Sequence, residues 1–270
     1  MYENILLICD MDGTLLNSKD EISKENIEAI EEFKAKGGLF TIATGRKESS
    51  VIEYLQQVPI NAPAILYNGS LIYDFNNQQV LWERELDYDV QEILLDIVKR
   101  FPNIGIEIYQ KSNIRLIKDN EYTQIHRSKE EYPYIIHSLV DLTPPWRKVL
   151  IAAETDTLTE IEQYMMELFA NQPMPFRICR SERYFLEWLP TNVSKGKAIE
   201  VLKEQFGFAN HNIITAGNET NDLEMLAEPN IGFAVENAHP DAKSVAKYIC
   251  ANHNEHPIRE IIHRLQEVIR

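Results

Sequence analysis

Short apolar segments alternate with amphipathic segments at the start of this 270-residue chain, and this alternation limits the folds open to it. The run Ile5 to Cys9 is apolar at every position, and two further runs, Leu39 to Ala43 and Ala64 to Tyr67, each follow a stretch in which apolar residues recur at helical spacing. Strands without polar alternation are typical of a parallel sheet that helices cover on both faces. We therefore predict an α/β fold with a Rossmann-like parallel sheet core.

The last third of the chain repeats this order of elements. Its expected strands are Asn212 to Ala216 and Ile231 to Val235, and the spacing of apolar residues predicts four helices: Ser194 to Phe206, one after Thr220, and two around Asp241 and Ile258. Parallel strands can be joined over long crossovers, so these strands can complete the first sheet. We expect one discontinuous core domain, made of residues 1–84 and 189–270.

The middle of the chain, residues 85–188, has a different pattern. Two strand-like runs, Ile104 to Tyr109 and Ile114 to Ile117, follow each other without a helix between them, which favours antiparallel pairing. Two amphipathic helices stand apart from these strands, and their apolar residues are Val90, Ile93, Leu94, Ile97 and Val98 in the first and Leu158, Ile161, Met165 and Leu168 in the second. We predict an inserted α+β domain.

Composition limits the partners of the chain. With 42 acidic and 27 basic residues its formal charge is -15, which disfavours nucleic acid and membrane surfaces but leaves room for a small anion in a locally positive pocket. Three cysteines lie far apart in apolar runs and indicate buried thiols in a reducing compartment. We see no secretory leader and no apolar run of about 18 residues. We expect a cytoplasmic protein, monomeric or homodimeric.

Two carboxylates follow the first apolar run directly, in the sequence Asp10-Met11-Asp12-Gly13-Thr14. Two neighbouring carboxylates repel each other, and a divalent cation relieves that repulsion. The same residue types also form ordinary solvated turns, so this alternative stays open at this point.

Polar residues follow the other expected core strands as well. Because ligands of an open parallel sheet bind at the carboxyl ends of its strands, these residues are candidates for one common site. Thr44 and Gly45 follow the second strand, Asn68 follows the third, and the segment 217–222 follows a later one, with Lys195 at the start of the preceding helix. Such a set suits a phosphoryl group and a hard divalent cation. Asn68 is equally suited to a simple turn, and Asn221 with Glu224 to a helix cap.

These segments resemble four signature motifs of the haloacid dehalogenase superfamily, and in particular its Cof-type phosphatases, which carry a large inserted cap domain. The first motif matches residues 10–16, the second residues 44–46, the third Lys195-Gly196, and the fourth residues 217–222. The motifs stand in the expected order, and a cap-sized insert lies in the expected gap. The resemblance covers the whole chain.

The resemblance implies a two-step phosphoryl transfer. Asp10 would be the nucleophile that becomes an aspartyl phosphate, and Asp12 would be the general acid and base. It also implies Mg²⁺ as the cofactor, held by Asp10, Asp12 and the residue at position 218, with possible support from Glu219 and Asp222. The phosphoryl oxygens would be bound by Met11, Thr44, Gly45, Asn68, Lys195 and Asn221.

One residue departs from the family pattern. Asn218 stands where the family usually has a metal-binding aspartate, so we expect weaker Mg²⁺ binding, with the adjacent Glu219 as a possible replacement carboxylate. We predict a metal-dependent phosphatase of small phosphorylated metabolites, with sugar phosphates as the leading class. The alternative is a catalytically weak phosphate-binding or regulatory protein on the same fold, and Asn218 is the feature that favours it.

Overall fold

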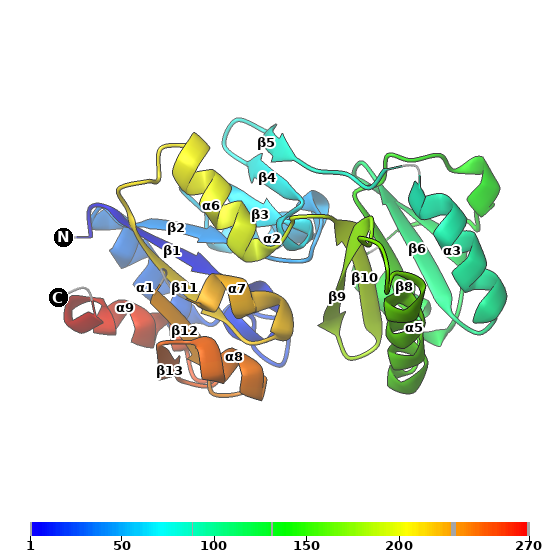
Figure 1. Cartoon of the computed structure of the whole chain (residues 1–270). Helices are drawn as coiled ribbons and strands as arrows, with labels where there is room; N and C mark the ends of the chain where they lie inside the picture. The colour runs from blue at the N-terminus through cyan, green and yellow to red at the C-terminus, as the bar shows by residue number, and fades with distance from the viewer. Residues whose placement is uncertain (1, 88, 131, 228–230, 269–270) are drawn as a thin grey trace. The chain divides into compact units, whose positions relative to one another are not determined.

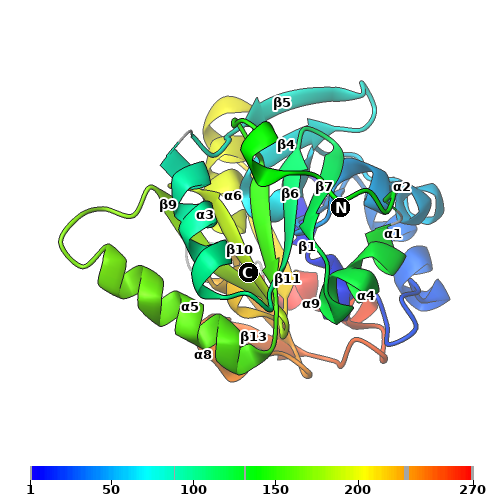
Figure 2. The same cartoon turned by 90° about the vertical axis from the view of Figure 1, so that its right-hand side faces the viewer.

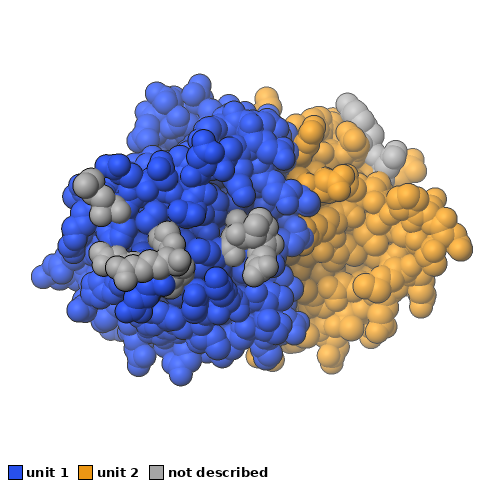
Figure 3. Space-filling view, turned by 60° about the vertical axis from the view of Figure 1, so that its left-hand side comes forward, with its two compact units in different colours: residues 1–83, 194–270 blue, residues 84–193 orange. Residues whose placement is uncertain are grey.

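The chain divides into two compact units. The structure, a computed structural model, describes residues 2–87, 89–130, 132–227 and 231–268. Unit 1 consists of Met1–Glu83 and Ser194–Arg270, and unit 2 of Arg84–Val193 (Figure 3). The observed insert thus begins one residue before the predicted boundary at 85 and ends five residues after the predicted boundary at 188.

Unit 1 contains a parallel sheet, as predicted, and this sheet has five strands. Its strands are β1 (Ile5–Cys9), β2 (Leu39–Ile42), β11 (Asn212–Gly217), β12 (Ile231–Val235) and β13 (Tyr248–Cys250), in the order β13-β12-β11-β1-β2 (Figure 1). All five residues of β1 are buried, which explains why the strand has no polar alternation. The sequence therefore located both the first strand and the class of sheet correctly.

The helices of unit 1 lie close to the predicted ranges. They are α1 (Lys24–Ala35), α2 (Glu48–Gln57), α6 (Lys195–Gln205), α7 (Leu223–Leu226), α8 (Pro240–Val245) and α9 (Pro257–Val268). The side chain of Ser23 caps α1 by accepting from the backbone N–H of Asn26, and Ser194 caps α6 in the same way through Lys197. The apolar residues of α2 do not all face the core: Ile52 is 44% exposed, whereas its neighbour Val51 is buried.

The third predicted strand forms part of a different sheet. β3 (Ala64–Leu66), β4 (Leu71–Asp74) and β5 (Gln79–Glu83) form an antiparallel three-stranded sheet. A single parallel bridge between Ala43 and Ile65 joins β3 to the end of β2. The strand also ends one residue early, because a 3-10 turn (Tyr67–Gly69) begins there.

Unit 2 is an antiparallel sheet with two of its helices packed against one face (Figure 2). Its strands are β6 (Gly105–Gln110), β7 (Asn113–Lys118), β8 (Lys148–Ala152), β9 (Phe176–Glu182) and β10 (Phe185–Pro190), in the order β7-β6-β8-β10-β9. The predicted helices correspond to α3 (Asp89–Arg100) and α5 (Thr155–Leu168). Their apolar faces form one cluster with alternate sheet residues, among them Ile106, Ile108, Val149, Ile151, Leu186 and Trp188. The opposite sheet face buries charged residues, among them Glu107, Lys148 and Glu187.

One helix of unit 2, α4 (Glu121–Glu130), is not predicted by the spacing of apolar residues. This helix buries polar side chains, Thr123 and His126 among them, while its Ile125 is 55% exposed. A helix with this inverted pattern has no apolar stripe that sequence periodicity can detect. None of the helices in the described part of the chain has the length and apolarity needed to cross a bilayer.

Candidate active site

The candidate residues of unit 1 meet at the carboxyl ends of neighbouring strands. β1 pairs in parallel with β11, where Cys9 lies opposite Ala216, and with β2, where Cys9 lies opposite Ile42. Asp10 extends the first pairing, since its N–H donates to the carbonyl of Ala216 at 2.9 Å. The residues that follow these strands therefore lie at one edge of the sheet, which is the physical basis of the predicted grouping.

A buried lysine joins two carboxylates at this edge. Lys195 Nζ lies 2.6 Å from Asp10 Oδ1 and 2.7 Å from Asp222 Oδ1. Burial raises the pKa of Asp10 from its usual 3.8 to about 8, and the charge of Lys195 opposes this rise. Burial lowers the pKa of Lys195, but the two carboxylates outweigh burial and raise it. One positive charge thus serves two buried carboxyl groups.

The second aspartate of the first motif, Asp12, pairs with an arginine of the second motif. Arg46 binds the Asp12 carboxylate through two hydrogen bonds, from Nε at 2.9 Å and from an Nη at 2.6 Å. The guanidinium group also lies over the ring of Tyr54, 5.1 Å from its centroid. A two-bond guanidinium pair fixes direction as well as distance, so Arg46 orients Asp12.

The turn that carries Asp12 is built around Gly13. Its φ of +73° lies in the left-handed region, and a Cβ atom there would come within 2.7 Å of the Asn218 side chain. A larger residue would therefore push Asn218 away from the turn. Asn237 holds the same turn by donating to the carbonyl of Gly13 at 2.8 Å.

The side-chain amide of Asn218 faces three oxygen atoms, which belong to Asp10, Asp12 and Thr14. One end of the amide lies 2.9 Å from Thr14 Oγ1, 2.9 Å from Asp10 Oδ2 and 3.0 Å from the carbonyl oxygen of Asp12. A carboxylate and a carbonyl only accept hydrogen bonds, so the network assigns the amide nitrogen to this end. Asn218 thus donates hydrogen bonds to Asp10 and Asp12, the two residues expected to hold the metal.

The fourth motif is arranged by a capping box. Glu219 accepts from the backbone N–H of Asp222, and Asp222 accepts from the N–H groups of Glu219 at 3.0 Å and Asn218 at 2.8 Å. The capping pair of this turn is therefore Glu219 with Asp222, and not the alternative pair Asn221 with Glu224. Asp222 positions both this turn and Lys195.

The expected phosphate-binding residues also lie together. Asn221 Nδ2 donates to Asn68 Oδ1 at 3.0 Å, and the N–H of Asn68 donates to the carbonyl of Thr44 at 3.0 Å. Asn68 is buried in the left-handed region, with φ +55°, and its amide packs against Gly45. A buried non-glycine residue in that region is often part of a functional site. Met11, also expected to bind phosphate, lies in the turn Met11–Leu15 that follows Asp10.

The donor groups at this edge suit a hard cation in part. In the described ranges, no three His, Cys, Asp or Glu side chains are grouped so that they could hold a metal ion. Mg²⁺, however, needs few protein ligands because it keeps several waters. The Asp10 carboxylate and the Asp12 carbonyl supply two oxygens, and Asn218 can supply a third if its amide turns over. With that rotation the residues fit the cation.

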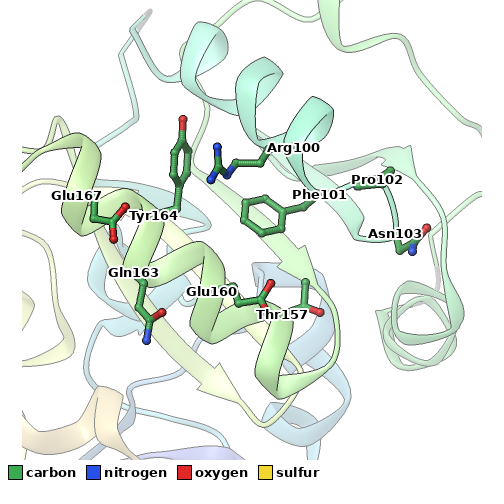
Figure 4. A pocket seen from close by; sticks show the side chains of 9 residues that line it. All are labelled: Arg100, Phe101, Pro102, Asn103, Thr157, Glu160, Gln163, Tyr164 and Glu167. Carbon is green, nitrogen blue, oxygen red and sulfur yellow. The ribbon is translucent and has the colours of Figure 1, made fainter.

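A groove in unit 2 is a separate feature. It has a volume of about 660 Å³ and lies between the end of α3 and α5 (Figure 4). Arg100 stacks over the ring of Tyr164 at 4.3 Å, and the hydroxyl of Tyr164 donates to Asp96 at 2.6 Å. None of the predicted site residues lines this groove, so we do not assign the reaction to it.

The family model of haloacid dehalogenase-like hydrolases matches residues 7–262, which include all four motifs. The chain belongs to this family. Two Bacillus subtilis proteins, both named 5-amino-6-(5-phospho-D-ribitylamino)uracil phosphatase, are 28% and 26% identical to it; the alignments cover 95% and 93% of this chain and 94% and 93% of theirs.

Solved structures agree with this assignment. A haloacid dehalogenase-like hydrolase from Bacteroides thetaiotaomicron superposes with a TM-score of 0.83 at 26% identity, covering 97% of this chain and 100% of that one. A structure described as a subclass IIB sugar phosphatase superposes with a TM-score of 0.84 at 22% identity, over 97% and 99% of the two chains, and supports the fold alone. The resemblance inferred from the motifs is thereby confirmed.

Proposed function

We propose that this protein is a Mg²⁺-dependent phosphatase that hydrolyses small phosphorylated metabolites through an aspartyl phosphate on Asp10. Sugar phosphates are the leading substrate class. The observation that carries the proposal is the buried arrangement of Asp10, Lys195 and Asp222 at the carboxyl end of β1, within a chain whose relatives include phosphatases. Buried carboxyl groups that share one lysine are costly to stability, and such strained electrostatics are typical of reactive sites.

The first step is attack by Asp10. Its carboxylate oxygen bonds to phosphorus while the bond from phosphorus to the substrate oxygen breaks, and Asp12 gives its proton to that leaving oxygen. Lys195 favours the ionised, reactive form of Asp10, whose pKa burial raises. Arg46 binds both oxygens of Asp12 and so favours its carboxylate form. In this proposal Asp12 takes up a proton and gives up one of these two hydrogen bonds before it acts as the acid.

The second step restores the enzyme. Asp12, now a carboxylate, takes a proton from water, the water oxygen bonds to phosphorus, and the bond to Asp10 breaks to release inorganic phosphate. Thr44, the backbone of Gly45 and Met11, Asn68, Asn221 and Lys195 would bind the phosphoryl oxygens. Asp10, the carbonyl of Asp12 and Asn218 would hold Mg²⁺, which when bound supplies positive charge against the phosphoryl oxygens. In the same proposal the insert, residues 84–193, selects the substrate.

Release of inorganic phosphate from a panel of phosphorylated metabolites, with and without Mg²⁺, tests this function. We expect metal-dependent turnover that Asp10→Asn lowers by at least about 10⁴-fold, because the variant keeps the shape of the side chain but not the nucleophile. Asp20→Asn is the matched control, since Asp20 is exposed and its φ of +58° suits asparagine equally. Binding of phosphate without turnover of any compound would instead favour a phosphate-binding or regulatory protein.

A further inference from the structure

Before any ligand binds, Asn218 supplies hydrogen bonds to the oxygens of the site. Its amide nitrogen donates to Asp10 Oδ2 and to the carbonyl of Asp12, at 2.9 Å and 3.0 Å. These two oxygens are the ones that the proposed function gives to the cation. An aspartate at position 218 could not donate these hydrogen bonds. Without a ligand, the oxygens of Asp10 and Asp12 are therefore hydrogen-bonded to Asn218, whereas an aspartate would face them as a further carboxylate.

Two basic side chains offset part of the negative charge around Asn218 without a metal. Arg46 pairs with Asp12, and Lys195 offsets one of the two carboxylates of Asp10 and Asp222. If these five groups are ionised, one negative charge remains among them and Glu219 adds a second, whereas an aspartate at position 218 would bring the total to three. A divalent cation alone therefore gains less attraction here than in a site with the carboxylate.

We infer that Asn218 makes Mg²⁺ and phosphate bind to this site as a coupled pair, each weakly alone and each strengthening the other. This inference rests on the proposed function, and it assigns to Asn218 the role of setting the strength of the coupling.

Three steps lead to this coupling. Mg²⁺ can use the Asn218 side chain only after the amide turns its oxygen inward, which breaks the hydrogen bonds to Asp10 and Asp12. The cation also lacks the attraction of a third carboxylate. A bound phosphate supplies anionic oxygens that compensate for both losses, and the cation in turn offsets the repulsion between phosphate and Asp10.

The neighbouring carboxylates already have other roles. Glu219 caps the turn at Asp222, and Asp222 binds Lys195 and two backbone N–H groups. Either would have to give up these contacts to replace the absent aspartate. A bound phosphoryl group, in contrast, can supply negative charge to the cation without breaking any of these contacts.

Calorimetric titration of Mg²⁺ into the wild-type protein, with and without saturating inorganic phosphate, tests the coupling directly. We expect phosphate to tighten Mg²⁺ binding at least about fivefold, and Mg²⁺ to tighten phosphate binding by the same factor. Equal Mg²⁺ affinity with and without phosphate would overturn the inference. This pair of titrations needs no variant.

Asn218→Asp tests the assignment to this residue. The variant is expected to bind Mg²⁺ alone about tenfold tighter or more, and to gain less from phosphate than the wild type does. Without metal it should also unfold at a lower temperature, because its carboxylate faces that of Asp10, and Mg²⁺ alone should restore the loss. The same coupling factor in variant and wild type would contradict the role of Asn218.

Asn212→Asp is the matched control. Asn212 is exposed at the opposite end of β11, so the same change of side chain on the same strand should leave the wild-type coupling unchanged. The binding tests need no turnover, which separates the two proposals. Phosphate release that survives Asp10→Asn overturns the proposed function, whereas metal-independent phosphate binding in an active enzyme overturns only the coupling.

Discussion

Both units bury charged side chains, but they balance them differently. In unit 1, Asp10 and Asp222 share Lys195, at 2.6 Å and 2.7 Å. In unit 2, Lys148 lies 2.8 Å from Glu187, and a second carboxylate, Glu107, has neutral or titratable partners of its own: His126 at 2.7 Å and the hydroxyl of Tyr132 at 2.6 Å. The network of unit 1 has one positive charge for two carboxylates, whereas each carboxylate named in unit 2 has a separate partner.

This difference is the one expected between a reactive site and a structural one. A buried carboxylate with its own hydrogen-bonded partner need not lower the free energy of unfolding, because the partner offsets the cost of desolvation. Two carboxylates on one lysine leave part of that cost unmet, and the raised pKa of Asp10 is the result. We therefore expect changes in the first network to affect turnover and changes in the second to affect folding.

Lys195→Met should have the largest effect. It removes the shared charge while keeping the length of the side chain, so we expect turnover to fall about 10³-fold, as when a donor to a developing oxyanion is lost. Steady-state phosphate release measures this. Lys197→Met on the same helix is the control, because Lys197 is half exposed and pairs with Glu200 at 3.0 Å. Equal turnover in Lys195→Met and Lys197→Met would remove the distinction between the two networks.

Lys148→Met should act on stability. Leaving Glu187 buried without its lysine should cost about 3 to 5 kcal/mol in the free energy of unfolding, measured with denaturant. The double variant Lys148→Met/Glu187→Leu should recover most of this loss, because it removes both buried charges. If the folded single variant instead loses turnover as strongly as Lys195→Met, the pair of unit 2 belongs to the catalytic machinery.

The smallest expected effect is the change in the free energy of unfolding per pH unit that comes from Asp10. The folded-state pKa of Asp10 is raised from 3.8 to about 8, so its contribution is fully present below about pH 4 and is lost as pH rises toward 8. The free energy of unfolding, measured with metal chelated, should fall by at most about 1.4 kcal/mol per pH unit from this group. Asp10→Asn should flatten this dependence, whereas Asp20→Asn should keep it; equal slopes in both would contradict the raised pKa.

The parallel sheet and the grouping of the site could be predicted because both follow from local pattern. Apolar runs without alternation identify the strands, and polar residues that follow parallel strands meet at one edge whatever the loops do between them. Helix α4 could not be predicted in this way. Its buried Thr123 and His126 are satisfied by residues such as Asn120 and Glu107, so tertiary contacts replace the apolar stripe.

The sequence by itself identified the candidate residues: Asp10 and Asp12 after the first strand, Lys195 at a helix start, and an asparagine at position 218. Only the tertiary structure decided what each side chain faces. Arg46 binds the carboxylate of Asp12, Glu219 caps the turn in which it lies, and the amide nitrogen of Asn218 donates to Asp10. Motif spacing fixes backbone position along the chain, but the direction of a buried polar group depends on donors and acceptors from distant segments, which meet only after folding.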